Sequence, residues 1–198
     1  MVRPVIRIAK EQDAVPMLEI YAPFVKETAI TFEYDIPTGE EFSKRIKKYL
    51  LEYPWLVWEQ EEQTIAYAYA SKHRDRAAYQ WSVESSVYVR PDFQRKGVAR
   101  SLYRVLFDLL KAQGILNVYA GIAQPNMKSV LLHQSCGFSD VGIYKNVGYK
   151  SGAWHDVLWM HKSLGHHPLQ PQKPVLFRDF QDTDSCKNIM KSVNETLV

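Results

Sequence analysis

Residues 82–113 combine a run of β-branched and aromatic side chains, a loop with one glycine, and a long segment with a single apolar face. The composition of residues 82–89 favours a β-strand. Residues 97–113 predict a helix that ends before Gly114. Its apolar stripe is formed by Val98, Leu102, Val105, Leu106, Leu109 and Leu110. A strand followed so closely by an amphipathic helix predicts a sheet with a helix packed on it.

The remaining pattern extends this sheet. Further strands are predicted at residues 5–8, 55–59, 64–71, 117–122, 138–144 and 154–161. Asp13 can cap one helix, which Pro23 is expected to kink or divide. Thr38 and Glu41 form a capping box for a second helix, and residues 126–136 predict another. Strands come first, followed by a strand–helix–strand–helix unit and a closing pair of strands. This order predicts an α/β (α+β) fold.

The length of the chain suits one main domain with additional residues. Its 198 residues are 46% hydrophobic, which provides for one full core. We expect the domain to cover residues 1–164. Residues 165–174 contain proline, glycine and histidine without periodicity, and they predict a linker. Residues 175–198 are expected to form an extension with one amphipathic helix, packed on its own domain or on a partner. A truncated second copy of the start of the chain is the weaker alternative.

Charge and cysteine content exclude several classes of protein. A net charge of +3 is too small to indicate a nucleic-acid-binding surface. Cys136 and Cys186 give neither a disulfide framework nor metal-ligand spacing, so we expect no metal and a reducing, cytoplasmic location. The first ten residues lack the apolar run of a signal peptide, and no apolar run is long enough to span a membrane.

The loop before the long helix carries the strongest chemical signal. In the sequence QRKGVA at residues 94–99, Gly97 allows a close approach of the backbone and Ala99 leaves room beside it. Helix N-termini direct unpaired N–H groups and a positive dipole end at anions. Arg95 and Lys96 add positive charge. The loop therefore suits a pyrophosphate, although an exposed basic turn explains the same residues. It lacks the Gly-Lys-Ser/Thr signature of a Walker loop.

Together with the preceding strand, this loop resembles the acetyl-CoA signature of the GNAT superfamily of N-acetyltransferases. The resemblance is closer to the branch of phosphinothricin and methionine sulfoximine N-acetyltransferases, and it covers about residues 4–164. The segments that carry it are TFE at 31–33, AYAYAS at 66–71, RDRAAY at 74–79, VESSVYV at 83–89, Pro125-Asn126 with Ser129 and Leu132-His133, Gly137-Phe138, and VGYKSGAWHDV at 147–157.

The resemblance implies a GNAT fold, a mixed twisted sheet that splays open between its fourth and fifth strands, with helices on both faces. Acetyl-CoA would bind in that gap. The residues expected to hold it are Val87, Tyr88 and Val89 on the strand, Arg95, Lys96, Gly97, Val98, Ala99 and Arg100 at the helix, and Asn126 and Ser129 on the opposite lip. Ala99 stands where many relatives have glycine.

Glu84 is the expected general base. An ammonium has no lone pair with which to attack a thioester, and a carboxylate beside the site can accept its proton. The alternative is a solvent-facing glutamate on a strand. His133 stands seven residues after Asn126, where many relatives place a tyrosine that assists the departing thiolate. It is the expected proton donor, with a packed helix histidine as the alternative. A backbone N–H near Val87 and Tyr88 would stabilise the oxyanion.

Substrate binding is expected from a set of polar and aromatic residues: Phe32, Glu33, Arg74, Arg76, Tyr79, Ser85 and Ser86. An arginine fork suits a substrate carboxylate or phosphinate, although Arg74 and Arg76 could also form a solvated loop. The predicted activity is acetylation of the primary amine of a small amino-acid-like substrate. Acetylation of a peptide or protein amine, and a non-catalytic acetyl-CoA sensor, are the alternatives. Relatives of this kind commonly form homodimers, so we expect one here.

Overall fold

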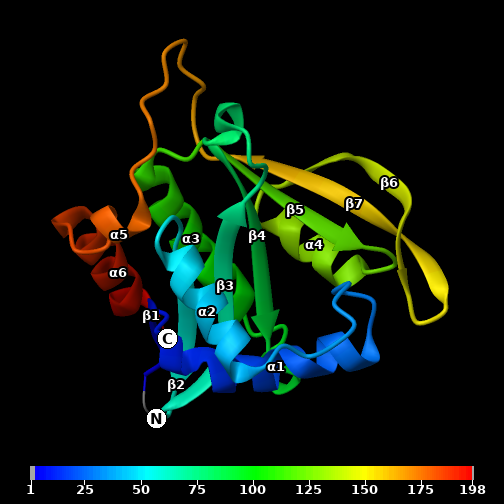
Figure 1. Ribbon diagram of the computed structural model, residues 1–198. Coiled ribbons are helices and arrows are strands. Elements are labelled where there is room, and N and C mark those ends of the chain that lie inside the picture. The colour runs from blue at the N-terminus through cyan, green and yellow to red at the C-terminus, as the bar shows by residue number, and fades with distance from the viewer. Residues whose placement is uncertain (1–2, 198) are drawn as a thin grey trace.

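The computed structural model describes residues 3–197, and within them a seven-stranded mixed sheet forms the centre of the molecule (Figure 1). The strands follow the order β1-β2-β3-β4-β5-β7-β6. Their bounds are Val5–Ile8 for β1, Trp55–Gln60 for β2, Gln63–Lys72 for β3, Ser82–Val89 for β4, Asn117–Ala123 for β5, Ser139–Lys150 for β6 and Ala153–Ser163 for β7. Neighbouring strands are antiparallel except for the parallel pair β4–β5.

Helices cover both faces of this sheet, as the sequence predicts. Helices α1 (Ala14–Glu27) and α2 (Gly39–Leu50) pack on the face that carries Trp55 and Tyr67. Helices α3 (Val98–Gln113), α4 (Met127–Ser135) and α6 (Asp184–Thr196) contribute to a larger core on the opposite face. The short elements are η1 (Glu11–Asp13), η2 (Ala77–Tyr79), η3 (Pro91–Phe93) and α5 (Phe177–Phe180). No helix within residues 3–197 is long and apolar enough to cross a membrane.

The parallel pair β4–β5 opens along its length, which confirms the predicted splay between the fourth and fifth strands. The strands pair from Ser82 opposite Asn117 to Glu84 opposite Tyr119, where the described pairing stops. β5 then continues beside β7, and β4 continues beside β3 as far as Val89. The two strands therefore diverge beyond Glu84. α3 follows β4 after a loop of residues 90–97, and α4 follows β5 after residues 124–126.

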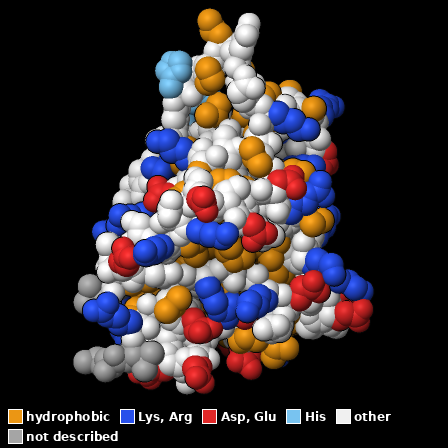
Figure 2. Space-filling model, turned by 90° about the vertical axis from the view of Figure 1, so that its left-hand side faces the viewer, with side chains coloured by type: hydrophobic (Ala, Val, Ile, Leu, Met, Phe, Trp, Pro, Cys, Tyr) orange, Lys and Arg blue, Asp and Glu red, His pale blue; other side chains and the backbone are white. Residues whose placement is uncertain are grey.

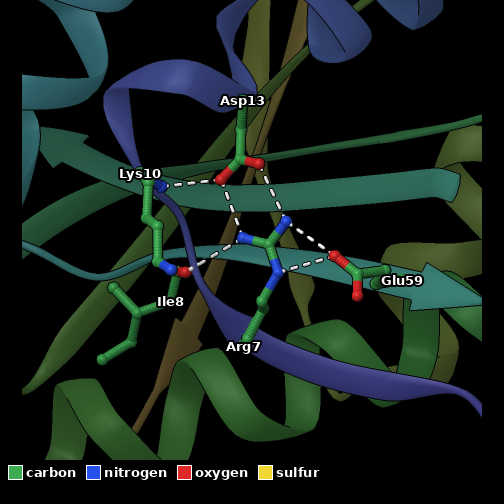
Figure 3. Close-up of polar contacts among 5 residues, drawn as sticks. All are labelled: Arg7, Ile8, Lys10, Asp13 and Glu59. Atoms are coloured by element: carbon green, nitrogen blue, oxygen red, sulfur yellow. Dashed lines mark hydrogen bonds and ion pairs between the residues drawn. The ribbon is translucent and has the colours of Figure 1, made fainter. Parts of the chain in front are cut away.

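An ion-pair cluster fixes the passage from β1 into α1 (Figure 3). Arg7 donates two hydrogen bonds to the Asp13 carboxylate, both 2.8 Å, and a third of 2.8 Å to Glu59. The Lys10 N–H also donates to Asp13. Burial by itself would raise the pKa of the Asp13 carboxyl, but its hydrogen bonds to Arg7 and Lys10 outweigh this effect and lower that pKa. Asp13 thus precedes α1 as predicted, but its side chain bonds to Arg7 and Lys10 and does not cap the helix.

The expected break at Pro23 does not divide the first helix. α1 continues through Pro23 to Glu27. A proline inside a helix removes one backbone hydrogen bond, which a sufficient apolar face can offset. The buried residues of α1 lie on both sides of Pro23, and they are Ala14, Met17, Ile20, Tyr21 and Val25.

The C-terminal residues pack on the same sheet as the rest of the chain. α6 contacts α3 and β1, and Phe177, Phe180, Cys186 and Val193 are part of the larger core. The predicted linker, residues 165–174, has no helix or strand and projects at the top of Figure 1. Figure 2 shows the side of the molecule that carries α5 and α6, where acidic and basic side chains are interspersed.

Candidate active site

The backbone of β4 turns hydrogen-bonding groups toward the gap at alternate residues. The Arg90 N–H donates to the Ile65 carbonyl of β3, so the Arg90 backbone faces β3. In an antiparallel pair, successive residues direct their backbone groups to opposite sides. Val89 and Val87 therefore present theirs to the gap, whereas Tyr88 faces β3. The Tyr88 ring instead packs on α1, 5.0 Å from Tyr21 between ring centroids.

The turn before α3 presents unpaired N–H groups. Gly97 has a φ of 83° and Arg95 has a φ of 61°, both in the left-handed region. The first hydrogen bond of the helix runs from the Ser101 N–H to the Gly97 carbonyl at 3.0 Å. The N–H groups of residues 98–100 precede it and so have no acceptor within the helix. A Cβ atom on Gly97 would meet nothing within 4 Å. This open, donor-rich turn fits a pyrophosphate.

The opposite lip of the gap is the start of α4. Asn126 is the N-cap, and its side-chain oxygen accepts a hydrogen bond of 3.2 Å from the Ser129 N–H. The amide NH₂ of Asn126 is a separate donor. Capping therefore fixes the Asn126 side chain beside the gap while keeping a donor that suits the amide groups of a pantetheine arm.

Glu84 is the last residue of β4 that pairs with β5, at the point where these two strands separate. Because side chains alternate along a strand, Glu84 shares its face with Ser86 and Tyr88. Its side chain is 32% exposed, so it is accessible without being fully solvated. The Oε1 atom of Glu84 lies 3.0 Å from Nδ1 of His73.

His73 is a site residue that the sequence reasoning missed. It follows the last residue of β3, and the β3–β4 register pairs Ser71 with Glu84. A hairpin with this register brings residue 73 beside Glu84. Only a precise register could have revealed this from sequence, because residues 73–81 have no periodicity.

His133 lies in the core and its two ring nitrogens both contact protein groups. Nδ1 lies 2.7 Å from the Ser129 carbonyl oxygen, and Nε2 lies 3.1 Å from the Tyr103 hydroxyl. A carbonyl oxygen only accepts, so Nδ1 carries the proton and Nε2 of the neutral ring accepts from Tyr103. Burial lowers the pKa of His133, although its bond to Ser129 opposes this effect.

Part of the predicted substrate set lies at the Glu84 end of β4. The pairing of Lys72 with Val83 places the loop of residues 73–81 beside the start of β4. Arg74 and Arg76 are exposed in this loop, and the Tyr79 ring lies 6.0 Å from that of His73. Ser86 shares the face of Glu84. Ser85 is buried on the opposite face, toward α3, which places it away from Glu84.

Phe32 and Glu33 lie in the connection between α1 and α2, toward the other end of β4 (Figure 1). The Phe32 ring covers Gly148 of β6 so closely that a Cβ atom there would lie 2.3 Å from the ring. Glu33 forms an ion pair with Arg45. Lys150 anchors this connection, because its ammonium donates to the Val25 and Thr31 carbonyls at 2.8 and 2.7 Å. The structure therefore does not group these two residues with Arg74.

The described residues, 3–197, contain no group of three or more histidine, cysteine, aspartate or glutamate side chains that could hold a metal ion. The polar groups along the gap are backbone N–H groups and the Glu84 carboxylate, and the exposed residues Arg95 and Lys96 lie in the turn before α3. Such donors suit an anionic cofactor and a proton transfer.

Comparison with known proteins agrees with this geometry. Residues 6–159 match the family model described as the acetyltransferase (GNAT) domain. The phosphinothricin N-acetyltransferase of Streptomyces viridochromogenes is 37% identical over 175 residues, covering 87% of this chain and 96% of the relative. The L-methionine sulfoximine/L-methionine sulfone acetyltransferase of Salmonella typhimurium is 34% identical over 163 residues, covering 82% and 95% of the two chains.

A solved structure extends the likeness to the cofactor. The GNAT superfamily phosphinothricin acetyltransferase of Sinorhizobium meliloti, in complex with AcCoA, superposes with a TM-score of 0.82 at 32% identity. The match covers 89% of this chain and 99% of that one. The splayed sheet and the open turn at Gly97 are what a shared cofactor site requires. The chain therefore belongs to the GNAT family and is an acetyl-CoA-dependent acyltransferase.

Proposed function

We propose that this enzyme acetylates the primary amine of a small amino-acid-like substrate of the phosphinothricin or methionine sulfoximine type. The observation that carries the proposal is the position of Glu84 at the point where β4 and β5 separate, at the end of β4 that adjoins the loop of residues 73–81 with its exposed Arg74 and Arg76. The names of the relatives point to the same class of substrate. A cationic loop beside a carboxylate suits a zwitterionic molecule, whose acid group and amine need partners of opposite charge.

In this mechanism Glu84 accepts a proton from the substrate ammonium and so frees the nitrogen lone pair. The amine nitrogen then forms a bond to the thioester carbon, and the carbon–sulfur bond breaks to release the thiolate. A Val87 N–H directed at the gap is the donor for the developing oxyanion, because the Tyr88 backbone faces β3. The base and the oxyanion donor come from one strand, which holds both in fixed register.

The assignment of His133 as the proton donor to the thiolate stays a prediction. Donation from Nε2 requires a ring protonated on both nitrogens, which the lowered pKa of His133 opposes near neutral pH. In the neutral ring the proton is on Nδ1 and bonds to Ser129. The Tyr103 hydroxyl, 3.1 Å from Nε2, is the other proton-bearing group of this pair.

Arg74 gives a prediction about substrate binding. Arg74→Ala should weaken binding of the amino-acid-like substrate about 10- to 100-fold, the usual effect of losing a charge-assisted contact. Affinity for acetyl-CoA should be nearly unchanged, since Arg74 lies in the loop before β4 and not at α3. Isothermal titration with each ligand measures both quantities. Arg178→Ala, which removes an exposed arginine of α5, is the matched control. Equal substrate affinity in the wild type and Arg74→Ala would place Arg74 outside the pocket.

The reaction itself is tested with a panel of amines. Purified enzyme is incubated with acetyl-CoA and phosphinothricin, methionine sulfoximine, protein amino acids or an unstructured peptide, and products are identified by mass spectrometry. We expect N-acetylated amino-acid analogues as the main products. Acetylation of the peptide alone would favour the protein-directed alternative. No product with any amine, despite acetyl-CoA binding, would favour a sensor.

We also propose that two copies associate through β6. This strand is an edge of the sheet, and its hairpin with β7 exposes Val141, Ile143, Tyr144, Val147, Tyr149 and Trp154. An exposed apolar edge of this extent is typical of an interaction surface. Analytical ultracentrifugation should give the mass of a dimer, and a monomer at all accessible concentrations would contradict the proposal. The cytoplasmic location stays a prediction.

A further inference from the structure

We propose that His73 is a positioning residue that holds the Glu84 carboxylate in its proton-accepting orientation. The inference rests on the proposed role of Glu84 as the base. Its direct observation is the contact of 3.0 Å between His73 Nδ1 and Glu84 Oε1. The His73 side chain is 14% exposed and that of Glu84 is 32% exposed, so the pair lies at the boundary between core and solvent.

The His73 ring is itself held by aromatic neighbours. It stacks on Tyr119, with ring centroids 4.5 Å apart and planes at 14°. The rings of Tyr79 and Trp159 meet it edge-on, each 6.0 Å away. These contacts come from η2, β5 and β7, so three separate elements fix the plane of the imidazole. A ring held in this way directs Nδ1 at one place.

The pair of His73 and Glu84 lies where β4 and β5 begin to separate. Tyr119 is the partner of Glu84 in the last pair before β4 and β5 separate. His73, stacked on Tyr119 and bonded to Glu84, therefore connects the two strands across the narrow end of the gap. A Glu84 carboxylate without a partner would be free to rotate about its side-chain bonds.

The chemistry of the contact fixes the direction of the hydrogen bond. An ionised carboxylate only accepts, so Nδ1 of His73 must carry the proton and donate it to Oε1. The second carboxylate oxygen of Glu84 then remains available for the substrate ammonium. A base accepts a proton efficiently only when it lies within hydrogen-bond reach of that proton. A donor that holds one carboxylate oxygen in place should therefore increase kcat measurably.

A pair of substitutions separates the hydrogen bond from the packing. His73→Phe keeps a ring on Tyr119 but removes the donor, and we expect kcat to fall about 10- to 100-fold, the usual effect of losing a hydrogen bond to a charged group. KM for the amine and affinity for acetyl-CoA should change little. His73→Asn keeps an N–H near the place of Nδ1 and should recover most of the loss. His161→Phe, which alters a second ring packed on Tyr119, is the control and should be nearly neutral.

A double-mutant cycle with Glu84→Gln completes the test. If His73 acts through Glu84, adding His73→Phe to Glu84→Gln should cause no further loss of kcat. The positioning role would be overturned if the kcat losses of the two single variants multiplied in the double variant. It would also be overturned if His73→Asn lost as much kcat as His73→Phe. If Glu84→Gln lowers kcat but His73→Phe leaves kcat at the wild-type value, only the role of His73 is overturned. A normal rate for Glu84→Gln would instead overturn the assignment of the base, and the role of His73 with it.

Discussion

Glu84→Gln is expected to lower kcat/KM about 10²- to 10⁴-fold at neutral pH, the range for loss of a general base. The substitution conserves size and removes the proton acceptor at the point where β4 and β5 separate. Acetyl-CoA affinity should be unchanged, because the pyrophosphate donors lie at α3. Raising the pH should partly restore the rate of the variant, since a larger fraction of the substrate amine is then neutral before it binds. Steady-state kinetics from about pH 6 to about pH 9 measure both effects.

The control for this prediction is Glu62→Gln, which makes the same chemical change in the exposed turn between β2 and β3 and should have no effect. A Glu84→Gln enzyme with wild-type rates over that pH range would contradict the assignment. Water or another carboxylate such as Glu33 would then accept the proton. Glu33 would have to leave its ion pair with Arg45 to do so.

Gly97→Glu should abolish useful binding of acetyl-CoA. The Cβ atom would enter the open space in front of the α3 N-terminus, where nothing lies within 4 Å, and the carboxylate would face the pyrophosphate. Like charges brought together cost several kcal/mol, so affinity should fall about 100-fold or more. Fluorescence or calorimetric titration with acetyl-CoA measures the loss, and activity should fall with it at ordinary cofactor concentrations.

Gly152→Glu is the matched control for this change. Gly152 has a φ of 79°, close to the 83° of Gly97, and a Cβ atom there also meets nothing within 4 Å. Both variants therefore carry the same backbone strain, but Gly152 lies in the β6–β7 turn. Normal acetyl-CoA affinity in Gly152→Glu with loss in Gly97→Glu is the expected result. Normal affinity in Gly97→Glu would place the pyrophosphate elsewhere.

Elements with a buried face were predictable from the sequence over most of their length, whereas β6, which lacks one, was predicted only in its first part. The stripe on α3 and the capping box of α2 led to helices that the structure confirms. β6 was predicted to end at residue 144 and continues to Lys150. β7 was predicted at residues 154–161 and covers Ala153–Ser163. Nearly every side chain of β6 is exposed, so no alternation of polar and apolar residues marked the strand. Ser151 and Gly152, both at positive φ, form the tight turn that allows the two strands to continue.

Within the candidate site, backbone features followed from local sequence, whereas side-chain partnerships depended on tertiary contacts. The glycine loop and its position before α3 could be inferred from residues 94–99. The pairing of His73 with Glu84 could not, since it depends on the β3–β4 register and on Tyr119 of β5. The second contact of His133 is with Tyr103, which lies 30 positions away on α3. No pattern of spacing along the chain encodes that contact.

The two edges of the sheet differ because of Asn194 on α6. Its side-chain amide accepts a hydrogen bond of 2.8 Å from the Ile6 N–H and donates one of 2.9 Å to the Ile6 carbonyl, as an added strand would. The outer backbone groups of β1 at Ile6 are thus occupied by a side chain, which blocks strand addition there. The edge-to-edge association proposed above would therefore use β6 rather than β1 at Ile6. An assembly that adds at one edge closes as a pair and cannot propagate into a fibre.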